Sequence, residues 1–149
     1  MTLLADLAGA WAGAWAGENA FRLLPADAPH TAPATAVVQV AGAMTTVGYA
    51  WAHPEDGDQA GLLTLGPGDG EGSVVALWGD SWHQAPQARV LLGTSGGSSV
   101  TVGYDYVEGQ WRWEVTLRAA GDGLELRMDN VPLATGEGHT AMLASLRRA

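Results

Sequence analysis

Short runs of alternating apolar and polar residues, separated at regular intervals by glycine-containing pairs, constrain the fold of this chain more than any other feature. The separating pairs are Asp56-Gly57, Asp69-Gly70, Gly96-Gly97, Glu108-Gly109 and Asp122-Gly123. Such pairs favour tight turns, and alternation with period two is typical of strands that bury one face. The pattern predicts an all-β fold.

The alternating runs cover most of the chain after residue 15. We expect strands over residues 15–23, 35–41, 44–53, 61–65, 73–82, 89–94, 100–107, 111–118, 124–131 and 140–146. Tight turns force consecutive strands to pair, and closure of the sheet removes its exposed edges. We therefore predict a single up-and-down antiparallel β-barrel of about ten strands, formed by residues 1–149 as one domain.

Two segments depart from this alternation. One face of a short N-terminal helix is predicted from the spacing of Leu3, Leu4, Leu7, Ala8 and Trp11. Residues 25–33 contain three prolines, which cannot donate to a strand ladder, so we expect a loop there.

Composition excludes several classes of site and partner. The chain has no cysteine, which excludes disulfides and thiolate catalysis, and its four histidines are too widely spread to predict a metal site. A formal net charge of −9 disfavours nucleic acid and anionic membranes as partners. No apolar run has the length of a membrane-spanning helix, and the N-terminus lacks the basic segment of a signal peptide. We expect a soluble, cytoplasmic protein.

The densest group of chemically active side chains is the run 78–83, Trp-Gly-Asp-Ser-Trp-His. In an extended chain Trp78, Asp80 and Trp82 share one face, while His83 points to the other. A carboxylate in phase with two large aromatics indicates a pocket, because Asp is rarely buried unless it is paired. Asp80 and His83 meet only if a bulge or turn intervenes.

Asp80 has a structural and a functional interpretation. As a structural residue it would accept hydrogen bonds from a buried arginine or from indole N–H groups, and His83 would cap the end of the strand. As a functional residue it would orient a ligand, or form an acid–base pair with His83. Asn19 and Asn130 share their phase with apolar residues, so each needs an internal partner or a ligand.

Short motifs along the chain resemble those of known barrels. The opening Gly-Ala-Trp-Ala-Gly at 13–17 resembles the Gly-x-Trp start of the calycin superfamily, which includes lipocalins, fatty-acid-binding proteins and nitrobindins. In that superfamily the tryptophan closes one end of the barrel and an arginine of the last strand packs over it. The resemblance implies that Arg147 or Arg148 makes a cation–π contact with Trp15.

A closer similarity is to an uncharacterised bacterial group of nitrobindin-like barrels. The shared motifs are Gly-x-Trp-x-Gly-Glu-Asn, Tyr-x-Trp, Asp-(Ser/Thr)-Trp-His, Trp-x-Trp and Met-x-Asn-Val, which stand here at 13–19, 49–51, 80–83, 111–113 and 128–131. Nitrobindins hold haem through a histidine at the start of the last strand, and the resemblance implies His139 as that axial ligand. Residues 18–21 and 136–140 differ from the nitrobindin pattern.

These observations leave four functions open. The first is non-enzymatic binding of a small, apolar or aromatic ligand in the barrel cavity, with candidate contacts from Tyr49, Trp51, Trp78, Asp80, Trp82, His83, Trp113 and Asn130. The second is haem binding through His139. The third is an enzyme that uses Asp80 and His83, and the fourth is a filled barrel without a ligand that acts through its surface as a homodimer.

Overall fold

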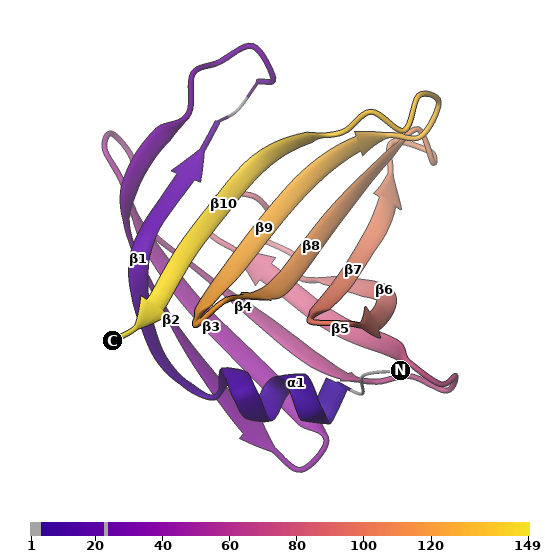
Figure 1. Cartoon of the computed structure of the whole chain (residues 1–149). Coiled ribbons are helices and arrows are strands. Elements are labelled where there is room, and N and C mark those ends of the chain that lie inside the picture. Colours follow the sequence, from indigo (N-terminus) through magenta and orange to yellow (C-terminus); the bar gives the residue numbers. More distant parts are fainter. Residues whose placement is uncertain (1–3, 23) are drawn as a thin grey trace.

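Ten antiparallel strands pair in chain order and close into a barrel in the computed structural model, which describes residues 4–22 and 24–149 (Figure 1). The elements are α1 (Leu4–Trp11), β1 (Gly13–Phe21), β2 (His30–Ala41), β3 (Met44–His53), β4 (Gly57–Pro67), β5 (Ser73–Asp80), β6 (Arg89–Gly96), β7 (Ser99–Tyr106), β8 (Trp111–Ala120), β9 (Gly123–Pro132) and β10 (His139–Arg148). The predicted all-β class, antiparallel barrel and short N-terminal helix are confirmed. Leu3 lies outside the described residues.

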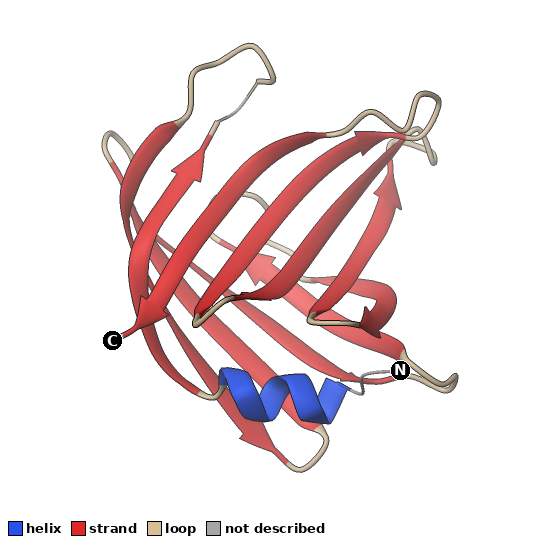
Figure 2. Cartoon of the chain, in the orientation of Figure 1, coloured by secondary structure: helices blue, strands red, loops and turns tan. Residues whose placement is uncertain are grey.

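The first and last strands meet and close the sheet. β1 pairs with β10, from Trp15 opposite Arg148 to Phe21 opposite Met142, and its other side pairs with β2. Every remaining pair joins consecutive strands. Figure 2 shows that strands form the whole wall of the barrel.

The helix α1 lies across one end of the barrel (Figure 1). Its spacing of three and four residues places Leu4, Leu7, Ala8 and Trp11 on the buried face. A helix this short depends on such packing, because its own hydrogen bonds are too few to stabilise it in water. The strands alternate in direction, so the ends of β3, β5, β7 and β9 lie at the opposite end, which we call the open end.

The interior changes in character from one end of the barrel to the other. Aliphatic side chains, with Trp11 and Trp15, fill the half nearest α1, and Tyr49, Trp51 and Trp78 line the wall towards the open end. Inward-facing residues of β7–β9 at the open end are only partly buried; these are Tyr104, Tyr106, Trp111, Trp113 and Asn130. The interior therefore meets solvent at this end.

The structure corrects several predicted boundaries: the strand expected over 15–23 is Gly13–Phe21, with residue 23 outside the described part, and the one expected over 61–65 is Gly57–Pro67. Two further corrections bear on the site. The loop expected over 25–33 is shorter, because β2 begins at His30 and includes Pro33. Proline has no N–H group to donate to a neighbouring strand. Pro33 is tolerated on the side of β3 because the pairing of β2 with β3 begins only at the next residue, Ala34, opposite Trp51. The strand expected over 73–82 ends at Asp80, and residues 81–84 turn back.

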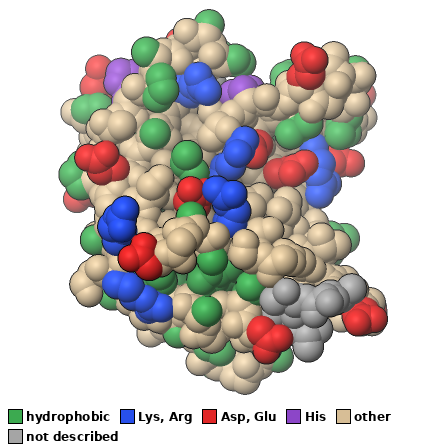
Figure 3. Space-filling view, in the orientation of Figure 1, with side chains coloured by type: hydrophobic (Ala, Val, Ile, Leu, Met, Phe, Trp, Pro, Cys, Tyr) green, Lys and Arg blue, Asp and Glu red, His purple; other side chains and the backbone are tan. Residues whose placement is uncertain are grey.

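Charged side chains gather on the outer face of β8–β10, which is in view in Figure 3. The shortest ion pairs there join Arg118 to Glu125 at 2.8 Å and Arg127 to Asp129 at 2.9 Å. Such exposed pairs add little to stability. Within the part of the chain that is described, no helix combines the length and the apolar character needed to cross a membrane.

Candidate functional site

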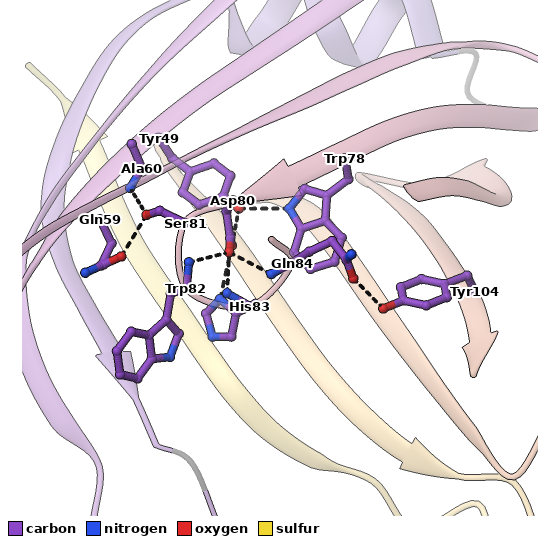
Figure 4. Close-up of polar contacts among 10 residues, drawn as sticks. All are labelled: Tyr49, Gln59, Ala60, Trp78, Asp80, Ser81, Trp82, His83, Gln84 and Tyr104. Carbon is purple, nitrogen blue, oxygen red and sulfur yellow. Dashed lines mark hydrogen bonds and ion pairs between the residues drawn. The ribbon is translucent and has the colours of Figure 1, made fainter. Parts of the chain in front are cut away.

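Asp80 organises the turn at the end of β5 (Figure 4). Its Oδ1 accepts backbone N–H groups from Trp82 at 2.9 Å, from Gln84 at 3.0 Å and from His83. A side-chain oxygen that accepts local backbone N–H groups is the usual way in which Asp stabilises a turn. This turn meets the condition under which Asp80 and His83 were expected to approach each other, in place of the opposite faces of an extended chain.

The second oxygen of Asp80 joins two side chains from different parts of the chain. Tyr49 Oη donates to Oδ2 at 2.7 Å, and the indole N–H of Trp78 donates to the Tyr49 oxygen at 2.8 Å. His83 Nδ1 lies 3.1 Å from the same Oδ2. The structural interpretation of Asp80 therefore needs correction. The carboxylate accepts from a phenol, an imidazole and backbone N–H groups, and the indole reaches it only through Tyr49.

Gly61 makes the contact between Tyr49 and Asp80 possible. Tyr49, Gly61 and Asp80 stand opposite one another on β3, β4 and β5. A Cβ atom on Gly61 would lie 2.2 Å from Tyr49 Oη and 2.6 Å from Asp80 Cβ. The phenol thus crosses β4 over a residue that has no side chain.

Burial and hydrogen bonding act in opposite directions on Asp80. Burial works to raise its pKa, but the side-chain hydrogen bond and charge of His83, the Tyr49 hydroxyl and the backbone donors together lower the pKa to about 2. Burial, followed by the nearby Asp80 charge, raises the pKa of Tyr49 well above its usual value. The site is therefore built on an ionised carboxylate and a neutral phenol.

His83 presents one nitrogen to Asp80 and keeps the other free. Its side chain is 7% exposed, and that of Asp80 is 2% exposed. Because the ionised carboxylate only accepts, His83 Nδ1 is the donor, and in the neutral imidazole Nε2 is then an acceptor. Nε2 is buried and has no partner among the described residues.

Aromatic rings surround His83 at the open end. Trp51 and Trp113 lie 6.2 and 5.4 Å from its ring centre, and Trp82 packs edge-on against Trp51 at 5.8 Å. Trp78 stacks on Trp113 at 6.0 Å. We call Trp51, Trp78, Trp82, His83 and Trp113 the aromatic cluster.

The aromatic cluster contains three buried polar atoms without a partner in the described part of the protein. They are Trp51 Nε1, His83 Nε2 and Trp113 Nε1. Buried polar groups nearly always have a hydrogen-bond partner, so each such atom requires an explanation. Two donors and one acceptor within one cluster are what a bound molecule with its own polar atoms would satisfy.

A hollow of about 220 Å³ adjoins the aromatic cluster at the open end. Its lining includes Phe21, His30, His53 and Trp82, with Asp27 and Glu55 among its charged residues. His53 stacks on Trp82 with ring centres 4.4 Å apart. Trp82 thus belongs to both the hollow and the cluster.

Two predicted site residues, Asn130 and His139, belong neither to the hydrogen bonds of Asp80 nor to the aromatic cluster. Asn130 stands opposite Trp113 on the neighbouring strand, but its side-chain oxygen accepts the hydroxyl of Tyr106. His139 begins β10 opposite Asn130 and is half-buried. Among the described residues, no ring contact joins His139 to the aromatic cluster.

Sequence reasoning missed three residues that support this site. Gln84 accepts the hydroxyl of Tyr104 at 2.8 Å, and Ser81 donates to Gln59 at 2.7 Å, which ties the turn to β4 and β7. Neither pairing has a signal in the sequence, because the partners lie about twenty residues apart. Gly61 did have one, since an isolated glycine inside a strand often marks a close approach.

A solved structure has the same fold. The crystal structure of Rv2717c from M. tuberculosis aligns with a TM-score of 0.66 and 16% sequence identity, over 99% of this chain and 99% of that one. At this identity the likeness concerns the fold alone. Neither a protein-family model nor a curated protein sequence matches the chain.

Proposed function

We propose that this protein is a non-enzymatic binder of a small, flat, largely apolar molecule at the open end of a calycin-like barrel. The observation that carries the proposal is the group of three unpartnered polar atoms on Trp51, His83 and Trp113. Ligand sites are typically apolar surfaces with a few placed polar groups, which is the composition of this cluster.

The hydrogen bonds of Asp80 support a binding role for His83. Asp80 holds the imidazole ring through Nδ1, which in the neutral ring leaves Nε2 as an acceptor of fixed direction. A rigid polar group needs little ordering when a ligand binds, which favours affinity. The ligand therefore offers an N–H or O–H group to His83 and accepts from the two indoles.

Native mass spectrometry of the freshly purified protein, compared with its denatured mass, tests this proposal. We expect a non-covalent adduct whose mass identifies the ligand. His83→Asn is the informative variant, because the Asn amide keeps a donor near the Nδ1 position and removes the acceptor at Nε2. Val90→Thr, on the exposed outer face of β6, is the control.

An adduct that is retained in Val90→Thr and weakened in His83→Asn would support the proposal. An adduct held equally by both variants would place the ligand elsewhere. If the bare mass persists after incubation with a set of flat aromatic compounds, the proposal fails and the barrel acts without a ligand.

Haem is the second candidate, favoured by a specific observation. Carboxylate-oriented histidines are the usual metal-binding form of the side chain, and His83 has that arrangement with its second nitrogen free. His139, the axial ligand implied by nitrobindins, is half-buried at the same end. Either histidine would hold the iron. Bound haem would supply an iron centre whose open position takes a further ligand.

Titration with hemin separates the two histidines. A strong visible absorption band that is lost in His139→Ala and kept in His83→Asn would assign the axial ligand to His139, and the reverse pattern would assign it to His83. The absence of a band with hemin in excess removes haem as a candidate.

A further inference from the structure

Asn19 is the most deeply buried polar side chain for which the structure offers no partner. It is 0% exposed, and neither its amide nitrogen nor its carbonyl oxygen has a hydrogen-bond partner among the described residues. It lies on the inward face of β1, between Trp15 near α1 and Phe21 at the open end. An amide placed in this way is costly to bury without a partner.

The wall around Asn19 is built from small residues. Ala32 of β2 and Ala144 of β10 stand directly opposite it, and Gly17 and Ala34 form the next pair towards α1. The side chains that flank Asn19 on β2 and β10 are thus single methyl groups, whereas Trp51, Trp78 and Trp113 stand on β3, β5 and β8. The amide is therefore not crowded by its neighbours along the wall.

Among the described residues, no charged side chain points into this part of the interior. The inward residues of the three strands at this level are apolar except for Asn19 itself. Arg22, the residue that follows β1, donates to the backbone carbonyls of Thr140 and Pro25. An ionised group would stand here without a counter-charge, so a neutral partner is favoured.

Asn19 lies one inward position away from the aromatic rings of the open end. Phe21 is the next inward residue of β1, about 7 Å further along the strand, and its ring lies 4.5 Å from that of Trp51. A flat molecule that binds at Trp51 and reaches Asn19 would therefore pass over Phe21.

We infer that Asn19 binds the polar end of the ligand, and that this ligand is a neutral aromatic compound with an amide or lactam group. An amide offers a donor and an acceptor side by side, which matches the N–H and C=O groups of Asn19. This inference rests on the proposed ligand-binding function and adds the chemical class of the ligand.

Three probes that differ only at one end test the inference: 2-naphthamide, 2-methylnaphthalene and 2-naphthoate. Their dissociation constants are measured by ligand-detected NMR on the whole protein and on Asn19→Leu, which is apolar and of similar size. Gln39→Leu, which replaces an exposed amide on the outer face of β2, is the matched control. Asn19→Ala replaces Asn19→Leu if the latter does not fold.

We expect the wild type and Gln39→Leu to bind the amide about tenfold more tightly than the methyl compound, as one or two added hydrogen bonds would give, and to bind the carboxylate weakly. In Asn19→Leu the amide and methyl compounds should bind alike. The empty Asn19→Leu variant should also melt at a higher temperature than the wild type, because a buried polar group without a partner has been removed.

Two results would overturn the inference while leaving the proposed function intact. One is binding of all three probes with a preference that Asn19→Leu does not change, as expected if an interior water alone satisfies the amide. The other is a lower melting temperature for Asn19→Leu, which would show that Asn19 is already satisfied within the fold. No binding of any probe to the wild type would contradict both this inference and the proposed function.

Discussion

At the scale of single residues, Asp80 connects the local turn to the interior of the barrel. One oxygen orders the backbone of residues 82–84, and the other holds the side chains of Tyr49 and His83. The sequence suggested a paired, buried carboxylate from its phase with two tryptophans. The identity of its partners depends on a turn and on a strand about thirty residues away.

Replacing this carboxylate should change both stability and its dependence on pH. We expect Asp80→Asn to lower the free energy of unfolding at pH 7 by about 2–4 kcal/mol, because the buried donors lose a charged acceptor. The pKa of Asp80 is about 2 in the folded protein against an ordinary 3.8. The stabilising contribution of the carboxylate is therefore complete above about pH 4 and is lost as the pH falls towards 2.

Denaturant unfolding of the wild type and Asp80→Asn between pH 7 and pH 2 measures both effects. The difference between their free energies of unfolding should shrink by about 2 kcal/mol as the pH falls from 7 to 2. Parallel curves would show that Asp80 is not preferentially ionised in the folded state.

At the scale of secondary-structure elements, the site depends on the register of three strands. Tyr49, Gly61 and Asp80 form one row across β3, β4 and β5. A shift of one residue in the register of β3 or β5 would turn Tyr49 or Asp80 to the other face of the sheet. The end of β5 at Asp80 matters equally, because it turns His83 back to the carboxylate.

We predict that Gly61→Ala disrupts this row. The new methyl group would meet Tyr49 and Asp80 at 2.2–2.6 Å, so the phenol must move and its hydrogen bond is lost. The expected loss in the free energy of unfolding is about 2 kcal/mol or more, with a change in the near-ultraviolet circular dichroism of the aromatic residues.

Gly48→Ala is the matched control for this prediction. Gly48 also lies in a strand, but a methyl group at this position would have Leu62 Cδ1 as its nearest neighbour, at 4.0 Å. The stability of this variant should stay equal or rise slightly, because alanine is more favourable than glycine within a strand. Equal losses of unfolding free energy in Gly61→Ala and Gly48→Ala would show that the missing side chain at Gly61 is not what allows Tyr49 to reach Asp80.

At the scale of the whole molecule, α1 and the last residues of β10 pack together at one end of the barrel. The guanidinium carbon of Arg148 lies 4.2 Å from the centre of the Trp15 ring. Its nitrogens donate to the carbonyls of Ala10, at 2.6 Å, and Ala12, at the C-terminal end of α1. Of the two arginines considered from the resemblance, Arg148 makes the cation–π contact.

Arg148→Ala should lower the free energy of unfolding by about 1–2 kcal/mol, because it removes both the cation–π contact and the partners of the helix carbonyls. Arg147→Ala is the adjacent control: the side chain of Arg147 is 81% exposed, and its ion pair within the described part of the chain is with the exposed Asp122. Thermal unfolding of both variants measures the difference. Similar melting temperatures would mean that Arg148 does not hold the helix against the barrel.

The fold class, the number of strands and most of their positions follow from the order of residues alone, because alternation and turn residues are local properties of the chain. The same local phases placed Trp78, Asp80 and Trp82 on one face of an extended chain and His83 on the other. Three features needed the folded barrel: the meeting of Asp80 with His83, the crossing of Gly61 by Tyr49, and the placement of Asn19 among small residues. These depend on the end of a strand and on register between distant strands, where side-chain contacts rather than local preference determine the outcome.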